Sequence, residues 1–330
     1  MGEPGGLDRR HHSPASPPLA PPRASPASHN HGLKSRTILG VRVDDVTYNE
    51  ALERCVALAG RGRPAYVVTP NPEFVILARH DPAFRAVLNE ADLSIPDGGG
   101  LLLAARLAGH PLREQVRGTD LAYGLIDHAP HAGWRVFLLG AAPGVAEAAA
   151  RALVRRTPGL QISGTFAGQA SPAGDAETVA AVRRAGRSDV LLVAYGARRQ
   201  ERWIARNLQQ LDVGLAMGVG GVLDFMSGRV PRAPAWVRRA GVDWLFRLAI
   251  QPSRFKRQAT TIPPFVLLSL LEAARKRHSP SPRSNDAPSS PRGEGGGDEG
   301  RPTPLGGLRR EPRIGAAQPG VEPEDGQHDG

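Results

Sequence analysis

Asp97 is the residue in this sequence whose type and setting best suit acid–base chemistry. It follows the short apolar run 93–96 and precedes the glycines 98–100, which leave room for a substrate to approach the carboxylate closely. A carboxylate in such a position can take a proton from an attacking hydroxyl, an effect typically worth about 10²–10⁴ in rate. A plainer interpretation is also open, in which Asp97 caps the helix that we predict over 101–108.

Thr69 and Asn71 form a second polar cluster, in the segment Thr69-Pro70-Asn71-Pro72 at the end of a β-branched run. The two prolines stiffen the segment, so both side chains can present hydrogen-bonding groups in fixed positions. The alternative is a turn in which these side chains satisfy the local backbone.

Two glycine-containing loops complete the set. The segment 196–201 follows an apolar strand and opens a helix, and the N–H groups and dipole at a helix start favour phosphate. The segment 218–224 follows the last predicted strand, with Asp224 placed to meet a sugar or a base edge. Solvated side chains in the first loop and a simple tight turn in the second are the alternatives.

Strand-like and helix-like segments alternate along the chain, which predicts a Rossmann-like α/β domain, a mostly parallel sheet with helices on both faces. The predicted strands are 37–43, 65–69, 93–96, 135–139, 160–164, 189–195 and 213–218, and the predicted helices are 48–59, one starting at 81–82, 101–108, 145–156, 176–185 and 198–208. In such sheets ligands bind beyond the carboxyl ends of the strands. All four polar clusters follow predicted strands, so we expect them to lie near one another.

Composition divides the chain into four parts. Residues 1–35 and 279–330 are rich in Pro, Ser and Gly, and we expect both to be disordered tails. The Rossmann-like domain is expected over 36–232, and a helical, basic appendage over 233–278. Cys55, the single cysteine, has apolar neighbours and is predicted to be a buried thiol.

The net charge of +10 is concentrated near the appendage: eight basic residues and one acid lie between 229 and 257. A basic surface of this kind suits nucleic acid, anionic lipid or a phosphorylated substrate. The longest apolar run, 262–271, is too short to span a bilayer, and no secretory signal is visible. We therefore expect a cytoplasmic protein that at most lies on the inner face of the plasma membrane.

Several chemistries are disfavoured by what the sequence lacks. No G-x-G-x-x-G or Walker A segment occurs, the ordered region has no Asp-x-Asp, and no serine or cysteine stands in a nucleophile elbow. The histidines have no metal-ligand spacing. We expect neither a cofactor nor a metal ion. A nicotinamide-dependent dehydrogenase and a nucleic-acid-binding protein are remote alternatives.

Taken together, the clusters resemble the WecG/TagA/CpsF glycosyltransferases, glycosyltransferase family 26, over roughly residues 37–258. The motifs that carry the resemblance, each modest but specific in this order, are TPNPEF (69–74), ADLSIPDGGG (91–100), GTDL (118–121), FLLGAAPGVAE (137–147), ARRQERWIARN (197–207), GVGGVLDFMSGRVPRAPAW (218–236) and DWLFRLAIQPSRFKR (243–257). Arg198 departs from the family pattern, in which a small residue or proline commonly stands before the basic-Gln-Glu run.

The resemblance implies a fold of the GT-E type and a metal-independent, inverting transfer from a UDP-sugar to a polyprenyl-diphosphate-linked acceptor. It makes Asp97 the expected catalytic base, with Thr69 and Asn71 beside it. The residues expected to contact substrate are Thr119, Asp120, Gly140, Gly196, Arg199, Gln200, Glu201, Gly220 and Asp224.

The family's appendage is thought to close the active site and to meet the membrane. The residues expected to do this here are Arg232, Arg238, Arg239, Arg247, Arg254 and Arg257. An anionic membrane surface and a second copy of the chain are the partners that we consider, and nucleic acid is not one.

Among the sugars that this family transfers, N-acetylmannosamine onto undecaprenyl-diphosphate-linked N-acetylglucosamine is the favoured reaction. Transfer of glucose or of N-acetylmannosaminuronic acid stays open. A non-catalytic sugar-nucleotide binder is disfavoured because Thr69, Asn71 and Asp97 are all present.

Overall fold

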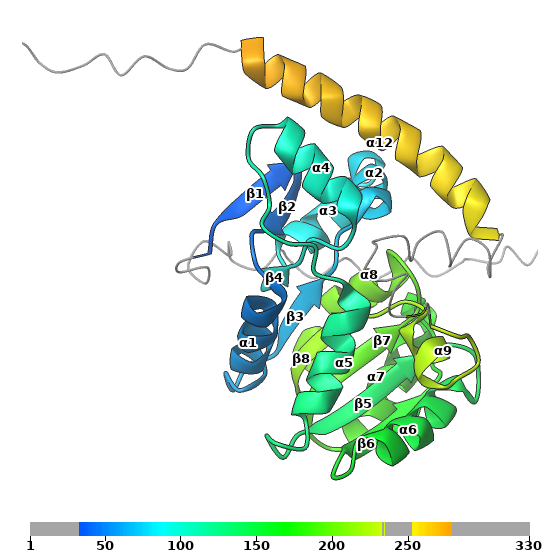
Figure 1. Ribbon diagram of the computed structural model, residues 1–330. Helices are drawn as coiled ribbons and strands as arrows, with labels where there is room; N and C mark the ends of the chain where they lie inside the picture. The colour runs from blue at the N-terminus through cyan, green and yellow to red at the C-terminus, as the bar shows by residue number, and fades with distance from the viewer. Residues whose placement is uncertain (1–32, 233, 235–252, 279–330) are drawn as a thin grey trace, which may run out of the picture. The chain divides into compact units, whose positions relative to one another are not determined.

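A computed structural model describes residues 33–232, 234 and 253–278 (Figure 1). Most of the two expected tails, and Arg238, Arg239 and Arg247, lie outside the described residues. The backbone of residues 254 and 257 is described, within a helix, but their side chains are not.

Six parallel strands form the central sheet, in the order β4-β3-β8-β7-β5-β6. The strands are β3 (Ala65–Val68), β4 (Leu93–Ser94), β5 (Arg135–Gly140), β6 (Gln161–Phe166), β7 (Ser188–Ala194) and β8 (Val213–Gly218). Every neighbouring pair runs in parallel. The α/β fold with a parallel sheet, predicted from alternating strand and helix patterns, is confirmed.

Side chains alternate between two cores, one on each face of the sheet. In β5, Val136 and Leu138 belong to the first core, whereas Phe137 and Leu139 belong to the second. This is why these strands read as continuous apolar runs rather than as alternating ones. Cys55 is fully buried in the first core, as predicted, and burial raises the pKa of its thiol to about 12.

Helices cover both faces (Figure 1). Those that contribute to the first core are α1 (Tyr48–Ala59), α5 (Gly118–His128), α6 (Val145–Arg156) and α9 (Val222–Met226). Those that contribute to the second are α2 (Pro72–His80), α3 (Pro82–Asn89), α4 (Gly99–Leu107), α7 (Asp175–Arg184), α8 (Arg199–Asn207) and α12 (Ser253–His278). Two short 3-10 turns are η2 (Pro172–Gly174) and η3 (Leu208–Gln210).

The single strand predicted over 37–43 is wrong. The chain instead forms an antiparallel hairpin, β1 (Ser35–Ile38) and β2 (Val41–Asp44). Its two turn residues, Leu39 and Gly40, have φ angles of 48° and 88°, and left-handed residues at both central positions give the turn that matches the twist of paired strands. Leucine is unusual in that position, so the sequence does not indicate the turn.

Helices α2 and α5 were not predicted. The first begins directly after Asn71, whose Oδ1 accepts a hydrogen bond from the Phe74 N–H at 3.0 Å. The second begins at Gly118 after Arg117, and no side-chain hydrogen bond caps its start. Helix α2 therefore begins within the Thr69–Pro72 cluster, and α5 begins in the GTDL motif.

Helix α12 packs against α2 and α4 and buries Phe265, Ser269 and Ala273, residues spaced four apart along one face. The Glu272 carboxylate accepts a hydrogen bond from the Leu39 N–H at 3.2 Å, which joins α12 to the hairpin turn. No helix within the described part of the chain has the length and apolar character needed to cross a membrane.

Gly214→Ala should destabilise the sheet by about 1–3 kcal/mol, a typical cost of overpacking. A Cβ at this position in β8 would lie 2.6 Å from the Ala59 carbonyl oxygen and 2.8 Å from that of Asp189, and neither backbone atom can rotate away. Urea unfolding measures the effect. Gly60→Ala is the matched control, because its nearest contact would be an ordinary 3.7 Å. Equal stability of the two variants would contradict the packing argument.

Candidate active site

The polar clusters lie along one edge of the sheet, where the carboxyl ends of the strands meet; we call this the carboxyl edge. The strand order places Asp97 after β4, Thr69 after β3, residues 218–220 at the end of β8, Gly196 after β7 and Gly140 at the end of β5. β5 leads on to β6 on one side and β7 leads on to β8 on the other, so the chain reverses direction between them. Ligands of open α/β sheets bind at such a reversal.

The Asp97 carboxylate lies at the start of α5. Its Oδ2 accepts a hydrogen bond from the Gly118 N–H at 3.1 Å. Two backbone hydrogen bonds restrain the chain on either side of this contact. The Asp97 N–H donates to the Pro70 oxygen, and the Val116 N–H, two residues before Gly118, donates to the Pro96 oxygen, each at 2.9 Å. The side chain is half-buried. The alternative in which Asp97 caps the following helix is wrong, since Gly98 is the N-cap of α4 and no side chain bonds there.

Gly118 makes this contact sterically feasible. A Cβ there would lie 2.9 Å from the Thr69 Cγ2 and 3.3 Å from the Asp97 Oδ2. Thr69 is nearly buried, so it packs directly against the helix start beside the carboxylate. The sequence placed Gly118 in the GTDL motif but did not single it out, because its partner Asp97 lies 21 positions away. An N–H group at a helix start stabilises negative charge beside it.

Asn71 fills the first of the two roles that the sequence left open, and the functional one stays a prediction. Its oxygen caps α2, as the local-backbone interpretation has it. The capping bond restrains the side chain at the start of α2. Asn71 lies beside Gly98, since a Cβ added to Gly98 would be 3.6 Å from the Asn71 Cβ.

Gln200 and Glu201 are both buried below the loops that follow β7 and β8. The Gln200 Oε1 accepts hydrogen bonds from the Gly196 N–H at 3.1 Å and from the Gly220 N–H at 2.9 Å. Its Nε2 donates to the Glu201 Oε1 at 2.7 Å. The amide therefore joins two loops that the sequence had treated as separate clusters.

Arg198 adopts a φ of 68°, a left-handed conformation that is uncommon for a residue with a side chain. This is where the sequence departs from the family pattern. The Arg198 guanidinium lies 3.8 Å from the Asp81 carboxylate, and Arg202 contacts the same carboxylate at 2.5 Å. Arg199, the second arginine of this loop, is exposed.

Gly140 ends β5 in close contact with β7. A Cβ there would lie 2.9 Å from the Ala194 carbonyl carbon, and the residue has a φ of 99°, so both space and backbone conformation require glycine. This close approach lies between β5 and β7, where the chain reverses direction.

Asp120 and Arg232 form an ion pair, although the sequence assigned them to different tasks. The Arg232 guanidinium also lies over the Tyr123 ring, 4.8 Å from its centre. The two contacts of Arg232 hold the chain at this residue against the first two turns of α5, the helix that begins at Gly118. Thr119 and Asp224 are half-buried, the first at the start of α5 and the second in α9.

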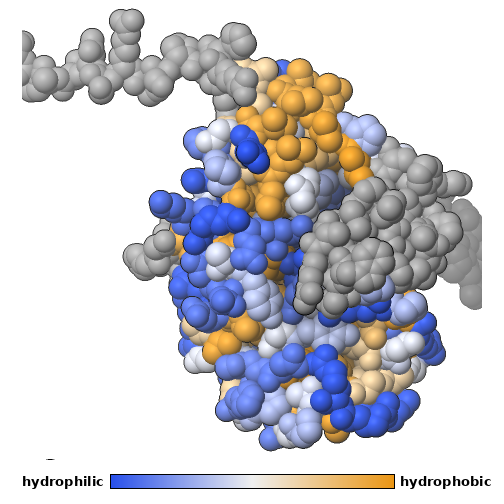
Figure 2. Space-filling model, viewed as in Figure 1, coloured by the Kyte–Doolittle hydropathy of each residue, from blue (hydrophilic) through white to orange (hydrophobic). Residues whose placement is uncertain are grey.

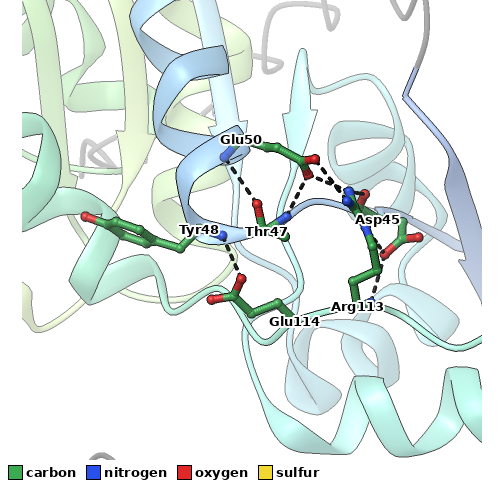
Figure 3. A network of polar contacts seen from close by, with 6 residues as sticks. All are labelled: Asp45, Thr47, Tyr48, Glu50, Arg113 and Glu114. Carbon is green, nitrogen blue, oxygen red and sulfur yellow. Dashed lines mark hydrogen bonds and ion pairs between the residues drawn. The ribbon is translucent and has the colours of Figure 1, made fainter.

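A polar network fixes the loop between α4 and α5 to the start of α1 (Figure 3). The Arg113 guanidinium donates to the Glu50 carboxylate at 2.5 and 2.9 Å and to the Asp45 carbonyl oxygen at 2.5 Å. Glu114 accepts a hydrogen bond from the Tyr48 N–H at 3.1 Å. Because this loop leads into Gly118, the network restrains the backbone that donates to Asp97.

No group of three or more histidine, cysteine, aspartate or glutamate side chains is arranged to hold a metal ion among the residues described.

Comparisons with known proteins agree with the geometry. Residues 36–279 match the family described as "Glycosyl transferase WecG/TagA/CpsF family". A protein of Bacillus spizizenii named N-acetylglucosaminyldiphosphoundecaprenol N-acetyl-beta-D-mannosaminyltransferase is 34% identical over 220 residues, which cover 66% of this chain and 84% of that protein. Proteins of the same name are 30% identical in Bacillus subtilis over 213 residues (64% and 82%) and in Staphylococcus aureus over 242 residues (72% and 93%).

Glu50→Gln should reduce the acid sensitivity of folding. The hydrogen bond from Arg113 is the largest cause that lowers the pKa of Glu50, from 4.5 to about 2. Because the folded value is the lower one, the stabilisation is complete above about pH 4.5 and is lost as the pH falls toward 2. Urea unfolding between about pH 7 and pH 3 should show the free-energy gap between wild type and variant narrowing as the pH falls.

The matched control is the same substitution in an Arg113→Gln background, where Glu50 no longer has its main partner and the change should have little effect. A gap that stays constant across the pH range would contradict the role of this ion pair.

Proposed function

Because the chain belongs to the WecG/TagA/CpsF family of glycosyltransferases, we propose that it transfers N-acetylmannosamine from a UDP-sugar to undecaprenyl-diphosphate-linked N-acetylglucosamine. The relatives' names support both the sugar and the acceptor, since each is an N-acetylmannosaminyltransferase acting on N-acetylglucosaminyldiphosphoundecaprenol. We propose that the transfer inverts the anomeric carbon and needs no metal ion.

The observation that carries the proposal is the Asp97 carboxylate, half-buried at the carboxyl edge and bonded through one oxygen to the Gly118 N–H. A general base needs a fixed position and an ionised form. The helix start supplies both, because its N–H orients one carboxylate oxygen and favours negative charge. The other oxygen, Oδ1, is then suited to face the hydroxyl of the acceptor sugar.

The proposed step is a single displacement. As the acceptor hydroxyl oxygen forms its bond to the anomeric carbon, its proton passes to Asp97 and the bond from that carbon to the UDP oxygen breaks. The leaving UDP takes the electron pair of the broken bond. We place its diphosphate at the loops of Gly196 and Gly220, which follow adjacent strands, because the first leads into the start of α8 and carries Arg198 and Arg199, and a helix start and arginines suit phosphate oxygens.

Asp97→Asn should lower turnover by at least about 10²-fold, because the amide cannot accept the proton. Its affinity for UDP should stay within about threefold of wild type, since the donor loops are untouched. UDP release with a short-chain lipid-diphosphate acceptor measures the first quantity, and titration calorimetry with UDP the second.

Asp127→Asn is the matched control for that variant. Asp127 lies near the other end of α5 in an exposed pair with Arg156, so the same chemical change there should leave turnover near wild type. Undiminished turnover in Asp97→Asn would rule out the base. Running the assay with several UDP-sugars identifies the donor, and preference for UDP-glucose would replace N-acetylmannosamine in the proposal.

An acceptor bound to a lipid requires the enzyme to work at a membrane surface, and we propose that α12 meets it. Its outward face carries exposed apolar side chains, and a hydrophobic area lies over this helix in Figure 2. The exposed residues are Ile262, Val266, Leu267, Leu270 and Leu271. The sequence places basic residues near both ends of the helix, at 254, 256 and 257 and at 275–277. Apolar insertion flanked by cations suits an anionic interface.

The double change Leu267→Ser and Leu271→Ser should weaken binding to vesicles of anionic phospholipid by about tenfold or more, because each apolar side chain that inserts contributes to membrane affinity. Vesicle sedimentation measures the binding. Val154→Ser is the matched control, since Val154 is an equally exposed apolar residue on α6. If the double variant and Val154→Ser bind the vesicles equally well, the proposed role of α12 is wrong.

A further inference from the structure

Gln200 and Glu201 form a buried pair that no step of the proposed reaction uses. Their exposed fractions are 3% and 1%, and the Gln200 Nε2 donates to the Glu201 Oε1 at 2.7 Å. Burial is the largest influence on Glu201 and raises the pKa of its carboxyl to about 7. A carboxyl in this position is costly for folding, so its contacts need an explanation beyond packing.

The carboxyl group decides which way the Gln200 amide points. A side-chain amide has an oxygen that accepts and a nitrogen that donates, and the two can exchange places by rotation about one bond. Glu201 offers an acceptor oxygen, so the amide nitrogen turns toward it. The amide oxygen is then directed at the two N–H groups of Gly196 and Gly220.

The reverse orientation would place the NH₂ group against two N–H donors and leave both without an acceptor. Both bonds would be lost, so the rotation would release the two loops from each other. Gly196 and Gly220 have φ angles of 80° and 56°, a conformation that glycine adopts without steric cost, so both loops turn here.

Gly218 provides the space for the pair. A Cβ there would lie 2.6 Å from both the Gln200 Nε2 and the Glu201 Oε1. The glycine of β8 and the two polar residues of α8 therefore form one unit below the loops.

We propose that Glu201 is a positioning residue for the donor diphosphate: by orienting the Gln200 amide, it holds the loops of Gly196 and Gly220 at the spacing that binds a nucleoside diphosphate. The inference rests on the proposed function, which places the donor at these loops. Glu201 itself touches no substrate. Its removal should raise the KM for the donor much more than it lowers kcat.

The test compares UDP affinities by titration calorimetry on the full chain. Glu201→Ala removes the acceptor and should weaken UDP binding by about tenfold or more. Glu201→Gln can offer its own amide oxygen to Gln200 and should stay within about threefold of wild type. Gly218→Ala displaces the pair without altering either member, and should reproduce the loss.

Asn207→Ala is the control for general destabilisation. Asn207 is as buried as Glu201 and lies on the same helix, but its Nδ2 donates to the Trp203 carbonyl oxygen, away from the loops. This variant should lose stability in thermal unfolding while it binds UDP as wild type does.

Two results would overturn the inference while leaving the proposed function intact. One is wild-type UDP affinity in folded Glu201→Ala and Gly218→Ala. The other is an equal loss of affinity in Asn207→Ala, which would reduce Glu201 to an ordinary buried residue. Failure of the wild-type protein itself to bind UDP would overturn both the donor site and the inference built on it.

Discussion

Backbone N–H groups at the carboxyl edge need acceptors, and this need organises the whole candidate site. In a parallel sheet the chain leaves every strand at the same edge, and the helices that follow begin there with N–H groups that have no partner within the helix. Here three side chains supply acceptors. Asn71 accepts from Phe74, Asp97 from Gly118, and Gln200 from Gly196 and Gly220. One of these acceptors, Asp97, is also the base of the proposed reaction.

Two glycines support the same arrangement, because at each of them a Cβ would occupy space that neighbouring side chains fill. Gly118 lets Thr69 and Asp97 close on the start of α5, and Gly218 lets the Gln200–Glu201 pair sit below β8. In each case a Cβ would come within 3 Å of a neighbouring side-chain atom. These glycines thus set contacts between side chains and backbone rather than serving turns alone.

The sequence predicted the layout of the site better than its bonds. Alternating strand and helix patterns were enough to place Asp97, Thr69, Gly196 and Gly220 at one edge, and the motif order indicated the family, which the comparisons confirm. Partners could not be predicted, because a hydrogen bond such as that from Gly118 to Asp97 depends on which helix start the strand order brings alongside. The alternative interpretation of Asp97 therefore had it cap the next helix in sequence, whereas its partner Gly118 begins the helix after that one.

The local errors have a similar origin. The hairpin at Leu39 was predicted as one strand because leucine rarely adopts the left-handed conformation of a turn, so the sequence does not indicate a turn there. The family resemblance made Gln200 an expected substrate contact, and this stays a prediction; the sequence did not indicate that the Gln200 amide oxygen accepts hydrogen bonds from the N–H groups of two loops. Motif matching finds the residues that matter at this position. The geometry adds that Gln200 joins two loops of the carboxyl edge.

The two carboxyl groups of the site differ in the way that their surroundings require. Asp97 lies at the partly exposed start of a helix, where an N–H stabilises its charge and solvent or substrate can reach it. Glu201 lies below the donor loops, where burial raises its pKa to about 7 and its main partner is a neutral amide. A full negative charge directly beneath bound phosphates would oppose their binding. Burial makes that charge costly, and Gln200 stands between Glu201 and the loops. Both features would reduce this repulsion if the donor binds where we propose, so an acid at the proposed acceptor side and one at the proposed donor side are compatible with one edge of the sheet.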